Sequence, residues 1–419
     1  MAVVLEGVHR DVGVGGGGDG GGCGGGGGVG VDLISCNNNT NGDQVNLTEI
    51  IKTFKLKWPV EEWKKLGLFD DEYLYKINKY WMKFPPPSPM SHYFMGIIYS
   101  VIMVVGVFGN FLIIYLFLRK RSLRTPSNVF IFNLAVSDSL LLLKMPVFII
   151  NSFYLGPALG NLGCSAYGFV GGLTGTVSIM TLAAIAFDRY QVIVHPLERK
   201  TKAAVYFQIL LIWIYAIFFS IIPLLDVGLN KYVPEGYLTS CSFDYLTQDT
   251  ASRLTIFVFF VAAWIVPLSI ILGSYMALYK VVLKARGTHF NTVMTRHCKD
   301  IEIQRPELKA AVTVICIVCL WTLSWTPYAV VALLGITGNE KYISPMSSMI
   351  PALFCKTASC IDPFVYAATN RRFRNELKRK YRKRSRYQPS LKTERKDFFT
   401  LSEDNNDRGK GNTIRIREK

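Results

Sequence analysis

Seven long apolar stretches divide this sequence, and they leave few folds open to it. Each is at least about 20 residues long and poor in charge, which is what a helix needs to cross the hydrocarbon core of a bilayer. A core helix of a water-soluble protein seldom needs such a run. The sequence therefore predicts an all-α membrane protein with a seven-transmembrane helix bundle between residues 91 and 369. The expected spans are 92–118, 127–150, 164–186, 204–225, 254–283, 310–335 and 346–369.

The positive charges indicate how the bundle is oriented. The chain has 47 Lys and Arg against 30 Asp and Glu, but the basic residues gather in particular loops, which argues against nucleic acid as the partner. The loops after spans one, three and five are rich in them, whereas the alternate loops contain only Lys231, Arg253 and Lys341. Basic loops stay in the cytoplasm, so we expect the N-terminus outside the cell and the C-terminus inside.

The N-terminal part of the chain divides into two segments. Residues 1–50 contain a glycine-rich tract and are expected to be disordered, because glycine at that density has too much backbone freedom to lose. Residues 51–90 are rich in Trp and Tyr, which predicts an ordered segment lying on the outer membrane surface. Asn38 and Asn46 begin sequons and are candidate glycosylation sites on that side.

The residues after the last span are basic and then polar. Between 370 and 386, Phe373, Leu377 and Tyr381 recur every four residues among many Lys and Arg. This spacing predicts a short amphipathic helix on the lipid of the inner leaflet. Residues 387–419 are polar and are expected to form a disordered cytoplasmic tail.

The cysteines are sorted by the predicted topology. Cys164 opens the third span at its outer end, and Cys241 lies in the outer loop between spans four and five, so both face an oxidising compartment. We therefore expect a Cys164–Cys241 disulfide. The cysteines inside the spans are expected to be small buried apolar residues; they are Cys316, Cys319, Cys355 and Cys360.

Each span also carries a short motif, in a fixed order along the chain. The motifs are Gly109-Asn110, "LAVSD" ending at Asp138, Asp188-Arg189-Tyr190, Trp213, Pro267 with Tyr275, "WTPY" at 325–328 and "DPFVY" at 362–366. One such match per helix resembles the rhodopsin-like family of G-protein-coupled receptors over residues 90–385. The resemblance implies a heterotrimeric G protein as the partner.

The same resemblance implies an activation switch at the cytoplasmic end of the bundle. Arg189 is expected to pair with Asp188 and with Glu307 until span six swings outward. The other residues that the resemblance assigns to the switch are Tyr190, Tyr275, Asp362, Pro363 and Tyr366. Asp362 replaces the Asn that is commoner in the family, a variant that many members carry.

Lys356 indicates the ligand. It lies seven residues before Pro363, near mid-membrane, where a lysine costs at least roughly 2.5–3.5 kcal/mol. Burial favours the neutral amine, which is the nucleophile that forms a Schiff base with an aldehyde. The chain thus resembles an opsin with Lys356 as the retinal attachment site, the chromophore being 11-cis-retinal or 3-hydroxyretinal. The alternative is a lysine whose amine reaches a helix end.

An opsin with a protonated Schiff base needs an anion beside it. Vertebrate visual opsins have a glutamate three residues after the span-three cysteine, but Tyr167 stands there. Glu235, six residues before Cys241, resembles the counterion of arthropod and other invertebrate opsins. The alternative for Glu235 is an exposed loop acid.

Further residues are expected around the chromophore. Trp325 and Tyr328 of span six, with Phe260 and Trp264 of span five, are expected to pack against it, or else to be plain core. An amine receptor would place an acid in span three where Gly171 stands, and this wall instead contains Gly168, Gly171, Gly172 and Gly175. These glycines indicate either room for a flat ligand or close helix packing.

Lys144 is a second lysine inside a span. It resembles the span-two lysine of insect ultraviolet-sensitive opsins and of the rhodopsin-seven group, where a second positive charge disfavours protonation of the Schiff base. The alternative is a lysine that reaches the outer interface. Asn370-Arg371-Arg372 stands where arthropod visual opsins usually have His-Pro-Lys, which favours the rhodopsin-seven branch and weakens inference about the G protein.

The sequence thus predicts a retinal photoreceptor of ultraviolet or broad-band sensitivity in the plasma membrane of a rhabdomeric photoreceptor or brain cell. A Gq-type G protein and arrestin are the expected partners. The main alternative is a receptor of the same fold for a diffusible peptide or small ligand. A light-driven ion pump would have no role for Arg189 and its acidic partners. An enzyme is disfavoured because the spans contain no nucleophile–base pair and no metal-binding cluster.

Overall fold

The computed structural model describes residues 40–195, 200–225, 227–287, 296–369, 373–376 and 378. The α-helices are α1 (Thr40–Lys57), α2 (Val60–Lys64), α3 (Lys79–Met82), α4 (Pro89–Arg119), α5 (Pro126–Leu143), α6 (Met145–Phe153), α7 (Gly160–Val194), α8 (Lys202–Ile221), α9 (Thr250–Phe260), α10 (Val266–Gly287), α11 (Arg296–Ile336) and α12 (Pro345–Thr369). Shorter elements are η1 (Asp71–Lys76), η2 (Arg121–Leu123), η3 (Ile222–Leu224), the π-helical η4 (Val261–Ile265) and η6 (Glu340–Tyr342). Two strands, β1 (Tyr232–Glu235) and β2 (Ser240–Phe243), complete the set.

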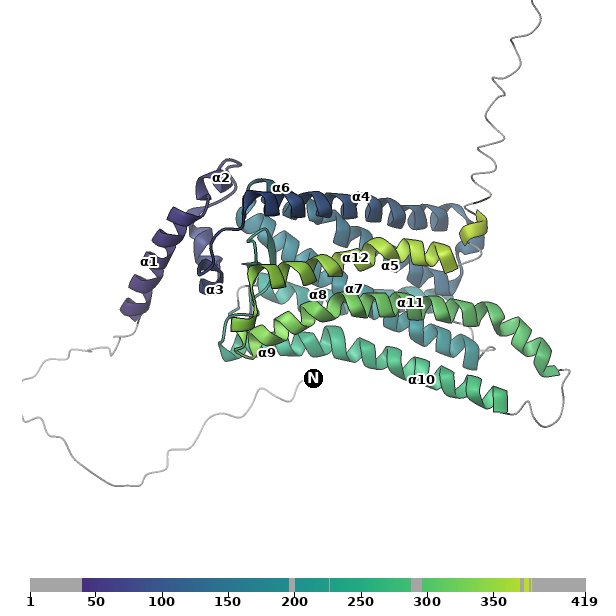
Figure 1. Ribbon diagram of the computed structural model, residues 1–419. Helices are drawn as coiled ribbons and strands as arrows, with labels where there is room; N and C mark the ends of the chain where they lie inside the picture. Colours follow the sequence, from purple (N-terminus) through teal and green to yellow (C-terminus); the bar gives the residue numbers. More distant parts are fainter. Residues whose placement is uncertain are drawn as a thin grey trace, which may run out of the picture. The chain divides into compact units, whose positions relative to one another are not determined.

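The long helices run side by side as a bundle (Figure 1). Within the described residues, six helical segments are long and apolar enough to cross a membrane. They are Pro89–Arg119, Pro126–Phe153, Gly160–Val194, Lys202–Leu224, Thr250–Val281 and Ala311–Ile336. The seventh, α12, has 25 residues and lies beside α11 and α4, but it carries Lys356 and Asp362 and is less apolar. The predicted fold class is confirmed.

Side-chain caps explain where the spans begin. A free backbone N–H in the first turn of a helix needs an acceptor, and Ser, Thr and Asp provide one from the N-cap position. Four spans use this device, and two of them add a proline in the first turn. The caps are Ser88 before α4, Thr125 before α5, Thr201 before α8 and Asp249 before α9.

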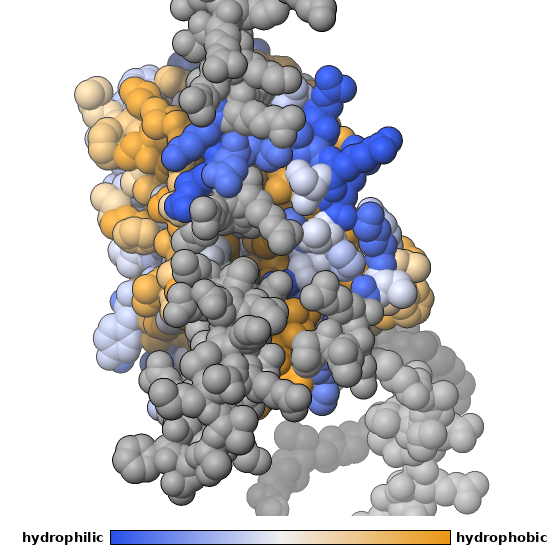
Figure 2. Space-filling model, turned by 90° about the vertical axis from the view of Figure 1, so that its right-hand side faces the viewer, coloured by the Kyte–Doolittle hydropathy of each residue, from blue (hydrophilic) through white to orange (hydrophobic). Residues whose placement is uncertain are grey.

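The bundle is apolar outside and partly polar inside. Phe108, Phe111 and Leu323 are exposed on helix surfaces, as expected where the solvent is lipid. Inside, Trp213 Nε1 donates to Asn133 Oδ1 at 2.9 Å, and Asn133 Nδ2 donates to Thr181 Oγ1 at 2.8 Å. Such bonds link neighbouring helices where apolar burial gives no driving force. Figure 2 looks onto the end of the bundle where α4 ends and shows hydrophilic residues gathered beside hydrophobic ones.

The cysteines in the spans differ from expectation in part. Cys355 and Cys360 on α12 are buried, as predicted. Cys316 and Cys319 are exposed, because they lie on the outward side of α11 and not on the side that packs against its neighbours. In a helix that is hydrophobic all round, the spacing of apolar residues in the sequence does not tell the packed side from the side that faces outward.

The aromatic N-terminal segment packs against the outer loops. In this segment, residues 50–84, which we call the outer cap, Trp63 is fully buried and its Nε1 donates to Leu155 O at 3.1 Å. Tyr80 OH donates to the carbonyl oxygens of Glu340 at 2.6 Å and Ile343 at 2.5 Å. The buried aromatic side chains thus find apolar partners within the protein, and the position of the segment on the outer membrane surface stays a prediction.

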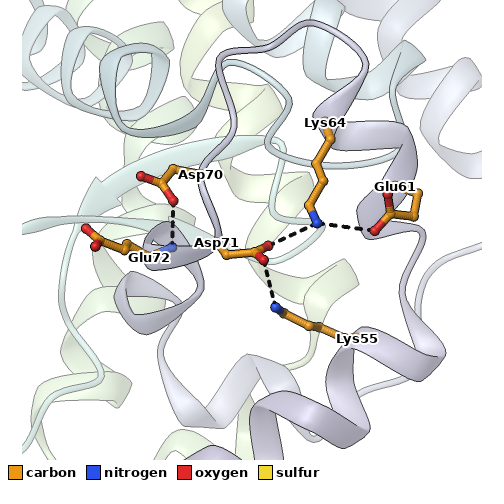
Figure 3. A network of polar contacts seen from close by, with 6 residues as sticks. All are labelled: Lys55, Glu61, Lys64, Asp70, Asp71 and Glu72. Atoms are coloured by element: carbon orange, nitrogen blue, oxygen red, sulfur yellow. Dashed lines mark hydrogen bonds and ion pairs between the residues drawn. The ribbon is translucent and has the colours of Figure 1, made fainter.

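An ionic network joins the parts of the outer cap (Figure 3). Asp71 lies 3.0 Å from Lys55 Nζ and 3.4 Å from Lys64 Nζ, and Lys64 Nζ lies 3.2 Å from Glu61. The hydrogen bond from Lys55 lowers the pKa of Asp71. These groups are partly exposed, so the network orders the segment more than it stabilises the fold.

The first helix begins at Thr40, inside the segment 1–50 that was expected to be disordered. The rest of that segment, including the candidate glycosylation site Asn38, lies outside the described residues.

The strands form a hairpin in the loop between α8 and α9. β1 and β2 pair antiparallel with Glu235 opposite Ser240, and the turn between them has positive φ at Gly236 and Leu238. Cys241 of β2 forms a disulfide with Cys164 of α7, so the predicted bond is confirmed. The bond fixes the hairpin against the N-terminal end of α7.

Candidate functional site

A cavity lies under the β1–β2 hairpin, between α7, α11, α12 and the α9–η4 region. The structure places all ten residues proposed for the chromophore on its wall: Lys144, Tyr167, Gly171, Gly175, Glu235, Phe260, Trp264, Trp325, Tyr328 and Lys356. They come from six separate parts of the chain. The fold therefore brings together side chains that the sequence connects only through motif spacing.

Lys356 reaches this cavity from the middle of α12. It is only 7% exposed, and its Nζ lies 5.9 Å from the ring centroids of both Tyr99 and Tyr167. Within the described part of the chain, it forms no ion pair. An amine buried in this way, without a carboxylate in contact, favours its neutral and nucleophilic form. The alternative of a lysine reaching the helix end does not fit this position.

Glu235 ends strand β1 and points into the same cavity. It is 3% exposed, which excludes the alternative of an exposed loop acid. Tyr245 OH and Tyr328 OH both donate to its Oε2, at 3.1 and 3.0 Å, and Ser240 Oγ lies 3.5 Å from Oε1. Burial raises the pKa of Glu235, and the nearby Lys356 and the two tyrosines act in the opposite direction.

Lys144 lies where α5 meets α6. Its Nζ donates to the backbone carbonyl of Tyr167 at 3.2 Å and lies 4.0 Å from the Tyr167 ring centroid. The amine thus faces α7 and the cavity, and the alternative of a side chain directed to the outer interface does not hold. Lys144 and Lys356 flank one aromatic ring.

Aromatic side chains form the part of the cavity away from the lysines. Phe260 and Trp264 stack with ring centroids 5.5 Å apart, and Trp325 stacks on Trp321 at 5.3 Å. Such a wall suits a long apolar ligand. Sequence reasoning missed Trp321, although its four-residue spacing from Trp325 on a helix was a usable signal.

The glycines of α7 make room mainly for side chains of the protein. A Cβ at Gly171 would lie 2.2 Å from Lys144 Nζ, and one at Gly175 would lie 2.8 Å from the Trp325 ring. In the same way, Tyr232 of the hairpin occupies the space beside Gly168, and Phe243 occupies the space beside Gly172. The glycines therefore shape the cavity indirectly, by letting its lining groups approach α7.

The expected switch residues lie at the other end of the bundle. Arg189 Nη2 lies 2.6 Å from Asp188 Oδ2, and Ser127 Oγ donates to the same oxygen at 2.7 Å. Tyr275 OH donates to Ala311 O at 3.2 Å. The side chain of Glu307 is outside the described part, so its pairing with Arg189 stays a prediction.

The remaining switch residues belong to the halves of α7 and α12 that lie farther from the β1–β2 hairpin. Tyr190 follows Arg189 directly on α7 and is partly buried. Asp362 and Tyr366 are buried, and the Tyr366 ring lies 5.2 Å from that of Phe373. Pro363 is a proline inside α12 and packs where a Cβ on Gly109 would lie 3.1 Å away.

Comparison with known proteins agrees with this geometry. The sequence model of the family described as "7 transmembrane receptor (rhodopsin family)" matches residues 109–366. "Opsin, ultraviolet-sensitive" of Apis mellifera is 38% identical over 316 residues, covering 74% of this chain and 85% of that protein. "Opsin Rh4" of Drosophila melanogaster is 38% identical over 313 residues, covering 73% and 82%. The crystal structure of squid rhodopsin matches with a TM-score of 0.69 at 30% identity, covering 73% of this chain and 89% of that one.

The chain therefore belongs to the rhodopsin family of seven-transmembrane receptors. It is a multi-pass membrane protein. Within that family it belongs with the opsins of the arthropod type, which are photoreceptors that bind retinal and act through a heterotrimeric G protein. The predicted family and function are confirmed.

Proposed function

We propose that Lys356 holds retinal as a Schiff base in this cavity. The observation that carries the proposal is a buried amine without an ion pair among the described residues, opening into a cavity with an aromatic wall. A neutral amine supplies the nucleophile for an aldehyde, and the aromatic wall accepts an apolar chain. When bound, retinal supplies isomerisation on absorbing light. The residues present thus fit the group, and both 11-cis-retinal and 3-hydroxyretinal suit the aldehyde chemistry.

Glu235 is the proposed counterion. It is the one carboxylate among the described residues that line the cavity. Tyr245 and Tyr328 both donate to Oε2, which stabilises the carboxylate and fixes its direction. In this role Glu235 balances either a protonated Schiff base or a protonated Lys144.

Lys144 is proposed to keep the Schiff base unprotonated and so to set near-ultraviolet absorption. A single carboxylate balances only one positive charge, and a second one in the same cavity is costly. When Lys144 carries the proton, the Schiff base is the group that stays neutral. The ultraviolet-sensitive opsin of Apis mellifera among the relatives supports this direction. We therefore propose that the protein has ultraviolet or broad-band sensitivity and belongs to the rhodopsin-seven branch of the opsins.

Signal transfer is proposed to run from the cavity down α11. Trp325 lies on the wall, two residues before Pro327, so a push on its indole displaces the lower half of the helix. That displacement separates α11 from Arg189 and opens a G-protein site. A Gq-type protein, arrestin and anionic lipid are the proposed partners at this end.

The placement in the cell is also a proposal. The distribution of basic loops puts the N-terminus outside the plasma membrane of a rhabdomeric or brain photoreceptor, with glycans at Asn38 and Asn46. Residues 370–386 form a helix on the inner leaflet in this proposal. The described residues 373–376 are helical, and Lys120 Nζ lies 3.1 Å from Glu376.

The test is an absorption spectrum of the protein expressed with 11-cis-retinal, before and after illumination. We expect a retinal-dependent band in the near ultraviolet that Lys144→Glu moves to the visible. Lys341→Glu is the matched control, because Lys341 is exposed in the outer loop after α11. We expect this variant to leave the absorption band in place. The absence of any such band overturns the proposed attachment, whereas an unshifted band in Lys144→Glu overturns only the role of Lys144.

A further inference from the structure

Two amines, and not one, face the chromophore cavity. Lys144 and Lys356 both line it, and their Nζ atoms lie 4.0 and 5.9 Å from the same Tyr167 ring centroid. The two nitrogens are therefore no farther apart than the sum of these distances. A ligand whose reactive end reaches one amine has the other close by.

The cavity gives Lys144 the space that an attacking amine needs. Gly171 lies directly beside it, and any side chain there would meet Nζ, since a Cβ would be only 2.2 Å away. Among the described residues, Lys144 Nζ donates one hydrogen bond, to the Tyr167 carbonyl at 3.2 Å. A neutral amine that donates one hydrogen in this way still has its lone pair for a carbonyl carbon.

Charge balance indicates that one of the two amines is neutral before retinal binds. Among the described lining residues, Glu235 is the one carboxylate, and it compensates one ammonium. A second, uncompensated ammonium in this apolar space is costly, so it loses its proton. The amine without the proton is the nucleophile, and nothing in the geometry restricts that state to Lys356.

We propose that Lys144 is a second imine-forming amine of this opsin, able to hold retinal covalently when Lys356 does not. The inference rests on the proposed function of the cavity as a retinal site. In the reaction, the Lys144 nitrogen attacks the aldehyde carbon and a C=N bond replaces the C=O bond. The oxygen leaves as water with the two hydrogens of the amine, so the step needs no oxidant or reductant. Replacing Lys356 therefore leaves a protein that still binds retinal covalently.

The test traps the imine and locates it. Protein loaded with 11-cis-retinal in the dark is reduced with sodium borohydride, which converts the imine to a stable retinyl amine, and peptides are mapped by mass spectrometry. Four proteins are compared: the wild type, Lys356→Met, Lys144→Met and the double variant. Lys356→Arg is added as a second substitution that keeps the positive charge, in case Lys356→Met does not fold, and size exclusion selects the folded samples.

We expect retinyl on the Lys356 peptide in the wild type and in Lys144→Met, on the Lys144 peptide in the Lys356 variants, and on neither in the double variant. A folded Lys356 variant without retinyl, beside a wild type that carries it on Lys356, overturns the second site and leaves the proposed function intact. A wild type without retinyl on either lysine overturns the proposed function itself. Retinyl in the double variant shows adventitious labelling and overturns the inference.

Discussion

Tyr328 on α11 and Glu235 on β1 are joined by a hydrogen bond of 3.0 Å across the cavity. The bond connects the helix proposed to move on activation with the loop that carries the proposed counterion. Tyr245 donates to the same oxygen at 3.1 Å, so the two hydroxyls share one acceptor. The strength of each bond therefore depends on the other.

The first prediction follows from this shared oxygen. Tyr328→Phe leaves a buried carboxylate with one donor fewer and should lower the stability of the dark pigment by about 1–3 kcal/mol. Tyr245→Phe should have a similar effect, and the double variant should lose more than the sum, because Oε2 then has no donor. Thermal denaturation of the four proteins measures the coupling. Strictly additive effects would show that the two hydroxyls do not act on one carboxylate.

The second prediction concerns pH and the retinal-free protein. Burial raises the pKa of Glu235, so the folded protein binds a proton that the unfolded chain has released. Stability therefore falls as pH rises from the ordinary pKa of glutamate, about 4.3, to the raised value, and is constant above it. Glu235→Gln cannot ionise at this position, so the fall in stability between these two pH values should be absent from the variant. A difference in melting temperature that does not depend on pH would contradict this.

The third prediction concerns the space beside Trp325. A Cβ at Gly175 would lie 2.8 Å from the indole, which is itself stacked on Trp321 and cannot easily shift. Gly175→Ala should cost about 1–3 kcal/mol and reduce the yield of pigment. Gly273→Ala is the matched control, because a Cβ there meets nothing within 4 Å. Equal pigment yields from the two variants would show that Trp325 does not depend on the glycine.

The fourth prediction concerns the pair of Asp188 and Arg189, at the end of the bundle away from the cavity. Asp188→Asn removes the charge that lies 2.6 Å from Arg189, which frees the guanidinium for another partner. We expect nucleotide exchange on a G protein to rise several-fold in the dark. Ser127→Ala removes only one hydrogen bond to Asp188 and should have a smaller effect. Dark exchange at the wild-type level in Asp188→Asn would mean that the pair does not restrain the receptor.

The sequence was sufficient for features that depend on long periodic runs or on distance along a helix. The spans follow from apolar length, and Lys356 is placed by its distance from Pro363 on one continuous helix. The Cys164–Cys241 bond follows from the predicted topology, which places both cysteines at the same end of the bundle. In each case one local rule fixes the position.

The sequence was insufficient where a position depends on a turn or on packing between distant segments. Tyr245 reaches Glu235 only because the hairpin turns back through Gly236 and Leu238, and no periodicity predicts that turn. The burial of Trp63 depends on Gly156, where a Cβ would lie 2.2 Å from the indole, and these residues are far apart in sequence. A rule for aromatic residues at membrane surfaces could not anticipate such a partner.

The position of the covalent bond to retinal in the wild-type protein decides whether Lys356 is the attachment residue. Dark pigment is reduced with borohydride, digested, and the peptide that carries the retinyl mass is identified. We expect this peptide to contain Lys356. Retinyl on another residue alone, or a retinal-dependent absorption band with no retinyl on any peptide, would contradict it.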